Sequence, residues 1–396
     1  MENFVKPEVL NVLFIVPLLL FCGPQGTGCQ TSPITADHAM SPARVQVVTS
    51  ESLNSQAVRY VNQGQFEEAR KILQHELEFL ERTGPATGLE AARTYQLLGE
   101  VAQIEGRLAE AEAAFKKSVA IMNRDVGASD FRTANALNSL GWFYHITGRL
   151  QEASPLLIKA FAVAQRVLPE DSPELIIFLD SQASLQCHSG HFTDAEKDWL
   201  RALRIAEKAF GDDARRYAAI LMHLGEMYSG LGDYTAAERL FRRCLAGYER
   251  ESTQLSVTQA VMMSELAAVY TKLNNFPAAG PLILRSIEIV NAAVNVNSVP
   301  LGNALVLSRA GDYYMVRHDW RTAEKEYRRA LKLREDTLGD HPLVASSLRS
   351  LSESLRKLNR KNEAKDDLAR AKQILAIQND PAYLGATVDV RAFQAK

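Results

Sequence analysis

The sequence has few of the residues that mark a disulfide-rich protein, a nucleic-acid-binding protein or a membrane-spanning chain. It contains 4 cysteines in 396 residues, and beyond the first thirty residues only Cys187 and Cys244 remain. Two cysteines in a long chain do not form a disulfide framework. Lys and Arg number 45 against 47 Asp and Glu, and the formal net charge is −2. This balance argues against nucleic acid as a partner, because phosphate binding requires a basic face.

Long apolar runs are also scarce, and the main one lies at the N-terminus. Residues 9–21, VLNVLFIVPLLLF, are too short for a membrane-spanning helix, which needs about 20 residues. The run is typical of the hydrophobic part of a secretory signal, and Lys6 precedes it. Gly28-Cys29 follows and resembles the end of a bacterial lipoprotein signal, although Gly26 stands where that pattern has a Leu-like residue.

We therefore expect a signal-like leader at residues 1–29 and a linker at residues 30–52. The lipoprotein resemblance implies lipidation of Cys29, membrane attachment through the N-terminus and a bacterial, exported protein of the cell envelope or periplasm. The alternative is a cytoplasmic protein whose translation begins at Met40.

Motifs for catalysis are absent. No glycine-rich phosphate loop follows a predicted strand, and there is no G-x-S-x-G motif. The His75-Glu76 pair lacks the second His of a zinc-binding H-E-x-x-H helix. Cys187, His188 and His191 are the most metal-like group, but the local sequence offers no fourth ligand. We expect no catalytic residues, no metal and no cofactor, and so a protein that is not an enzyme.

Most of the chain consists of one repeated unit. A glycine recurs at intervals of 42 residues in the first five units, at Gly64, Gly106, Gly148, Gly190 and Gly232. Each is followed by a bulky apolar residue and then by an Ala. The apolar residue and the Ala continue through seven units, and the alanines are Ala69, Ala111, Ala153, Ala195, Ala237, Ala279 and Ala323. An eighth, slightly shorter unit contains Ala364. A fixed period of this length is the signature of a repeat architecture.

Each unit has the pattern of two helices. In the fifth unit Leu221, Leu224, Gly225 and Tyr228 recur at helical spacing, and a second helical pattern begins at Tyr234. The Gly232-Asp233 pair between them is a turn signal. The small residue at Gly225 lets the two helices approach closely. The unit is therefore an antiparallel helix hairpin.

These residues resemble the tetratricopeptide repeat, whose pattern is W-x2-L-G-x2-Y, then A-x3-F, then Pro. The fifth unit has Leu224-Gly225-x-x-Tyr228, then Ala237 and Phe241. The 42-residue length, against 34 in the standard repeat, resembles kinesin-light-chain repeats, as does the Leu-Gly-x-His-Pro stretch at residues 338–342.

The resemblance covers residues 53–376 and implies an all-α fold. This would be a right-handed superhelical solenoid of about eight antiparallel helix hairpins, followed by a C-terminal tail at residues 377–396. The first helix of each hairpin would line the concave face, and each hairpin would contact only its neighbours.

The concave face is the expected binding surface. The candidate residues lie three before, one after and four after the small residue of the first helix, or one turn earlier: Gln96, Glu100, Gln103, Asn135, Asn138, Trp142, His145, Asp180, Met222 and Glu226. Amide side chains can both donate to and accept from a peptide backbone, and a Trp can anchor an interface. Asn138 matches an Asn that kinesin-light-chain-like repeats place in their peptide groove, but the other units lack it. The alternative is that these side chains only contact neighbouring helices.

The sequence thus favours a non-enzymatic scaffold or adaptor that binds a peptide or protein partner in its concave groove. The alternative is a structural spacer or self-assembling element anchored at the membrane, which would form homo-oligomers.

Overall fold

The computed structural model describes residues 53–61, 64–83, 88–249, 256–293 and 299–378. Within these ranges the regular structure is helical throughout, with no strand. None of the described helices has the length and apolarity needed to cross a membrane. The predicted leader with Cys29, the linker at residues 30–52, and nearly all of the predicted tail lie outside the described residues.

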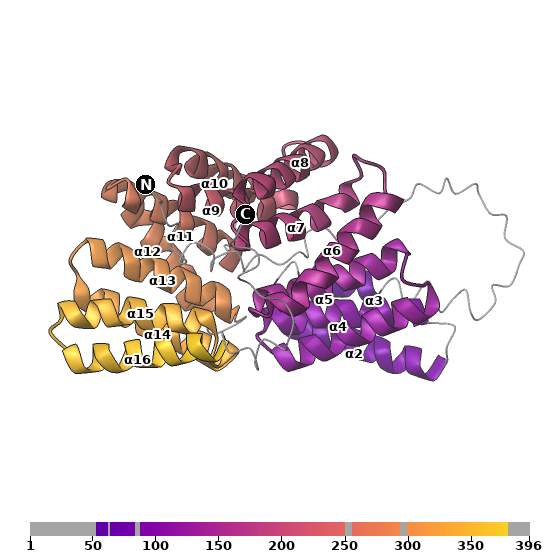
Figure 1. Cartoon of the computed structure of the whole chain (residues 1–396), viewed down its shortest axis with the longest axis horizontal. Helices are drawn as coiled ribbons and strands as arrows, with labels where there is room; N and C mark the ends of the chain where they lie inside the picture. Colours follow the sequence, from indigo (N-terminus) through magenta and orange to yellow (C-terminus); the bar gives the residue numbers. More distant parts are fainter. Residues whose placement is uncertain (1–52, 62–63, 84–87, 250–255, 294–298, 379–396) are drawn as a thin grey trace, which may run out of the picture.

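The described residues form eight successive helix hairpins, and Figure 1 shows their order along the chain. In the first, the helical residues 53–61 pair with α2 (Phe66–Thr83). The next seven pair α3 (Gly88–Ile104) with α4 (Leu108–Asp125), α5 (Phe131–Ile146) with α6 (Leu150–Val167), α7 (Ile176–His188) with α8 (Phe192–Phe210), α9 (Ala218–Leu231) with α10 (Tyr234–Glu249), α11 (Val257–Lys272) with α12 (Phe276–Ala293), α13 (Pro300–Val316) with α14 (Trp320–Leu338), and α15 (Pro342–Lys357) with α16 (Lys361–Gln378). This confirms the predicted all-α solenoid of about eight hairpins.

The recurring glycine ends the first helix of each of the first five hairpins in a left-handed conformation. Gly148, for example, has φ +76°, and the next amide, of Arg149, donates to the Tyr144 carbonyl at 2.8 Å. This is the bond of a Schellman cap, which favours Gly because Gly has no Cβ. The last three hairpins use other residues at the same place, Asn274, His318 and Asn359, with φ between 58° and 62°. Asn and His are among the residues most often found in this conformation.

The small residue in the first helix is required by the second helix. A Cβ added at Gly225 would lie 2.8 Å from a ring carbon of Phe241, and one added at Gly141 would lie 2.8 Å from Leu157. Both side chains on the second helix are fully buried. The glycine therefore makes room for the large residue that fills the hairpin core.

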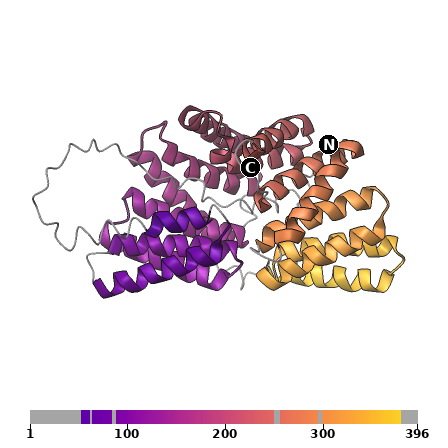
Figure 2. The ribbon, with the colours of Figure 1, turned by 180° about the vertical axis from the view of Figure 1, so that it is seen from behind.

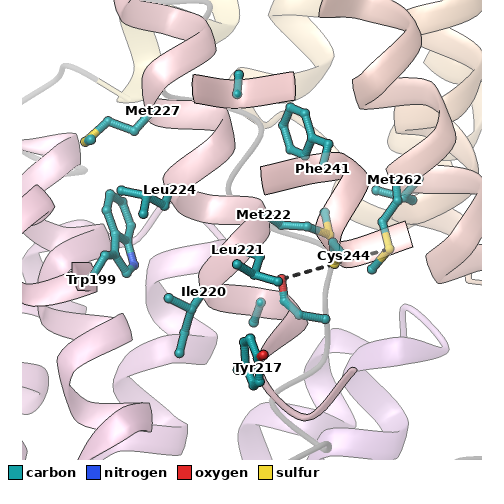
Figure 3. Close-up of a cluster of buried hydrophobic side chains, with 14 of the residues drawn as sticks. Trp199, Tyr217, Ile220, Leu221, Met222, Leu224, Met227, Phe241, Cys244 and Met262 are labelled. Atoms are coloured by element: carbon teal, nitrogen blue, oxygen red, sulfur yellow. Dashed lines mark hydrogen bonds between the residues drawn. The ribbon is translucent and has the colours of Figure 1, made fainter. Parts of the chain in front are cut away.

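The largest hydrophobic core runs through the middle hairpins (Figure 3). It includes Trp199, Phe241 and Cys244, which are completely buried. The Cys244 sulfur lies 3.4 Å from the Met262 sulfur and 3.7 Å from the Ala218 carbonyl oxygen. Cys244 is thus a small core residue, with no disulfide.

The solenoid curves until its early and late hairpins meet (Figures 1 and 2). Trp142 and Ile146, at the end of α5, form a buried cluster with Leu343, at the start of α15. A Cβ added at Gly148 would lie 2.9 Å from the His341 ring, and one added at Gly106 would lie 3.0 Å from Pro300. We call this contact surface the seam. It corrects the expectation that each hairpin touches only its neighbours: the third and eighth hairpins are in direct contact.

Candidate binding surface

The predicted site residues lie on the first helices of the second to fifth hairpins. Figure 1 shows α7 and α9 toward the centre of the molecule, with α8 and α10 outside them. Three of the ten residues, Glu100, Gln103 and Asn135, are partly exposed. The other seven are buried, at 9% exposure or less: Gln96, Asn138, Trp142, His145, Asp180, Met222 and Glu226. The inner face is therefore more enclosed than the sequence indicated.

The amide and carboxyl groups of α3 and α5 bind one another. The Gln96 amide donates to Ser139 Oγ at 3.1 Å and to Glu100 Oε1 at 3.3 Å. The Asn135 amide donates to Gln96 Oε1 at 3.4 Å. Glu100 is partly exposed as a whole, but its Oε2 is buried. Burial of the carboxyl group raises the pKa of Glu100 to about 7, and the Gln96 hydrogen bond opposes that rise. At 3.3 and 3.4 Å, the Gln96–Glu100 and Asn135–Gln96 bonds are longer than the usual N–H···O range of about 2.7–3.2 Å, and so they are weak.

An aromatic and histidine layer extends from α5 to α9. The Trp142 ring stacks on the His145 ring with centroids 5.2 Å apart, and His145 meets the edge of His188 at 4.5 Å. The His223 ring lies 5.8 Å from Trp142. Burial, and then the charges of His188 and His223, hold the pKa of His145 well below its usual value. Trp142 is 5% exposed and belongs to the seam, so its ring is not open to a binding partner in this structure.

Asp180 is the acceptor at the centre of a buried hydrogen-bonded group. Its Oδ1 accepts from Trp199 Nε1 at 2.7 Å and pairs with His223 Nδ1 at 2.7 Å. All three residues are completely buried. Sequence reasoning singled out Asp180 but missed both partners. Trp199 lies on the second helix of the same hairpin, and His223 lies 43 residues further on, about one repeat along the chain.

Glu226 is a buried carboxyl group without a hydrogen bond. It is 5% exposed, and neither oxygen has a partner among the described residues. The nearby Arg309 is already bound by Glu265, through Nε at 2.7 Å and a second nitrogen at 3.0 Å. Burial, and then the charges of Glu265 and Asp180, hold the pKa of Glu226 well above its usual value, although Arg309 lowers it.

Asn138 and Asn303 also have partnerless polar groups. Both side chains are buried, at 1% and 0% exposure, and the amide nitrogen and oxygen of each have no hydrogen-bond partner among the described residues. Buried amides are almost always hydrogen-bonded, so such groups call for an explanation. Asn138 was predicted from the sequence as a binding residue, whereas Asn303 on α13 was not.

The described residues contain no group of three or more His, Cys, Asp or Glu placed to hold a metal ion. Cys187 is buried and His191 is exposed at the start of α8. Burial, and then the charge of Glu226, raise the pKa of the Cys187 thiol to about 12. A surface hollow lined by Gln165 and Arg201 contains none of the predicted residues.

The fold and the repeat define this protein as a helical-repeat solenoid. The family model described as tetratricopeptide repeat matches residues 48–124, 90–166, 174–250 and 301–376, which is more than half of the chain. The chain therefore belongs to the tetratricopeptide repeat family, as its sequence predicted. Comparison with curated proteins gives no match.

Several solved structures are similar to the chain. A Rap protein complexed with Competence and Sporulation Factor has a TM-score of 0.65 and 14% identity, over 87% of this chain and 90% of that one. NprR in complex with its cognate peptide NprX has a TM-score of 0.58 and 16% identity, also over 87% and 90%. Kinesin light chain TPR-like repeats of Podosopora anserina match at 20% identity, over 55% of this chain and all of that one, with a TM-score of 0.39. At these identities the likeness concerns the fold.

Proposed function

We propose that this protein is a non-enzymatic interaction scaffold that binds a peptide segment of its partner along the inner face of the solenoid. Membership of the tetratricopeptide repeat family supports the proposal, as does the fold shared with Rap, which was solved with Competence and Sporulation Factor, and with NprR, which was solved with its cognate peptide.

The observation that carries the proposal is the pair of partnerless groups on the inner face, at Asn138 and Glu226. A buried polar group without a hydrogen bond costs about 1–3 kcal/mol. A ligand that supplies the missing bonds recovers this energy, and a peptide backbone offers both a donor and an acceptor to an amide such as Asn138.

The test is a selection of short random peptides displayed against the full chain, followed by binding measurements with the enriched peptides. The key variant is Asn138→Leu, which keeps the side-chain size and removes the amide. We expect it to lose binding while its thermal stability stays equal or rises, because an apolar group replaces an unsatisfied one. That combination separates loss of a contact from loss of folding.

The matched control changes the outer face. Ile158 on α6 and Leu284 on α12 are 52% and 55% exposed, and an Ile158→Ala, Leu284→Ala variant should bind the peptides as the wild type does. Binding that survives Asn138→Leu and disappears in the control would move the interface to the outer face. Enrichment of no peptide, together with concentration-dependent oligomers, would favour the spacer or self-assembling element instead.

A further inference from the structure

Glu226 lies near two other carboxylates, on Asp180 and Glu265, and near one cation, Arg309. From α7, Asp180 approaches with one oxygen bound to Trp199 and His223 and with Oδ2 unpartnered. From α11 comes Glu265, which holds Arg309 of α13 in a two-bonded ion pair. Of the three charged groups with the largest effects on the pKa of Glu226, Arg309 is the cation, and Glu265 and Asp180 are carboxylates.

The nearby cations are already used. Arg309 also lies 3.6 Å from Asp312, so its charge is shared between two carboxylates. His223, on the same helix as Glu226, has its Nδ1 on Asp180. The Cys187 thiol of α7 is another titratable neighbour, and burial keeps it protonated. Arg309 therefore offsets the charge of Glu226 only in part.

A buried carboxylate whose charge is offset only in part is strongly disfavoured, so in the ligand-free protein Glu226 is held in its neutral form. The protonated Glu226 carboxyl then has an O–H group and a carbonyl oxygen without a partner, and Asp180 Oδ2 is a further buried acceptor without a donor. An ammonium or guanidinium group supplies several donors and a positive charge at once, and charge-assisted bonds of this kind are the stronger ones.

We propose that Glu226 and Asp180 form a subsite for a cationic group of the peptide ligand, either a Lys or Arg side chain or a free amino terminus. This inference rests on the proposed peptide-binding function and specifies the chemistry that the inner face selects. A cation at this subsite would lower the pKa of Glu226, so binding would release a proton and strengthen as the pH rises.

The experiment compares three pools of short synthetic peptides by equilibrium dialysis against the full chain. The first pool is blocked at both ends and has a fixed central Arg. The second has citrulline, the neutral analogue, at that place. The third has norleucine there and a free amino terminus. We expect the first or the third pool to be retained about tenfold more than the second, which corresponds to one charge-assisted hydrogen bond, and the favoured pool identifies the source of the cation.

Two variants make the test specific. Glu226→Gln removes the charge and keeps the shape, and it should abolish both the preference for the cationic pool and the pH dependence of binding. Glu326→Gln is the matched control, because Glu326 is also buried, at 3% exposure, but has its own partner in Arg329 at 2.6 Å. It should leave the cationic preference unchanged.

The outcomes separate the two proposals. Equal retention of all pools, or a cationic preference that survives Glu226→Gln, would overturn the subsite while leaving peptide binding intact. Retention of no pool by the folded wild type would overturn the peptide-binding function and the subsite together.

Discussion

Asp180 and Asp171 allow a direct test of how burial decides the value of a polar contact. Both lie in the fourth repeat, and both contact a side-chain nitrogen at nearly the same distance. Asp180 pairs with His223 at 2.7 Å, with side chains 1% and 2% exposed, whereas Asp171 pairs with Lys208 at 2.6 Å, with side chains 65% and 72% exposed. Distance alone would give the two pairs equal weight.

The expected effects of Asp→Ala at the two positions differ greatly. Asp180→Ala removes two hydrogen bonds and leaves two buried donors, on Trp199 and His223, without an acceptor. Removing one partner of a buried pair typically costs about 3–5 kcal/mol of unfolding free energy. Asp171→Ala breaks a contact in solvent, where screening and side-chain entropy cancel most of the attraction, so we expect no measurable change.

Urea unfolding measures both variants, followed by far-UV circular dichroism and by tryptophan emission, to which the buried Trp199 contributes. Asp180→Asn provides a graded third point, because its amide oxygen still accepts from Trp199, and its loss should be intermediate. If the midpoints of Asp180→Ala and Asp171→Ala coincide, the reasoning from burial is refuted.

Three further predictions concern a pKa, a close packing contact and the seam. Burial raises the pKa of Glu100 from 4.5 to about 7, so the wild type binds an extra proton when folded and loses stability as the pH rises through this interval. Relative to the wild type, Glu100→Gln should therefore gain about 1–3 kcal/mol between pH 4.5 and pH 8 in denaturation measurements, and a constant difference would contradict the assignment. Gly225→Ala should cost about 1–3 kcal/mol, because its Cβ would lie 2.8 Å from the Phe241 ring. The double variant with Phe241→Ile, which copies the Ala267–Ile283 pair of the next hairpin, should recover part of that loss, and no recovery would argue against the clash. Leu343→Ala should weaken the seam and increase the radius of gyration in small-angle X-ray scattering, whereas Leu284→Ala on the outer face should not; an unchanged radius in both would mean that the seam does not hold the curvature.

The local structure was largely predictable, because it depends on residues close together in sequence. The repeated glycine predicted the ends of the first helices, and the caps at Gly148 and its equivalents confirm it. The signal weakened in the last three hairpins, because Asn274, His318 and Asn359 adopt the same conformation without being glycine. The alanines that follow these three residues, Ala279, Ala323 and Ala364, still mark the repeat.

The binding surface was only partly predictable. Helix geometry places Asn138, Asp180 and Glu226 on one face, and the sequence identified these positions. It did not indicate which of them would find partners. Asp180 is held by Trp199 and His223, whereas Asn138 and Glu226 have no hydrogen-bond partner among the described residues. Their predicted role in binding remains a prediction.

The sequence by itself determined the repeat, the hairpin and the close contact of its two helices, because each follows from side chains within one 42-residue unit. Only the tertiary structure decided that Trp142 meets Leu343 and that Glu226 lies among carboxylates from neighbouring hairpins. The physical reason is that the curvature of a solenoid is the sum of small rotations between successive units. No single unit encodes that sum, and so the contacts between distant hairpins appear only when all of them are stacked.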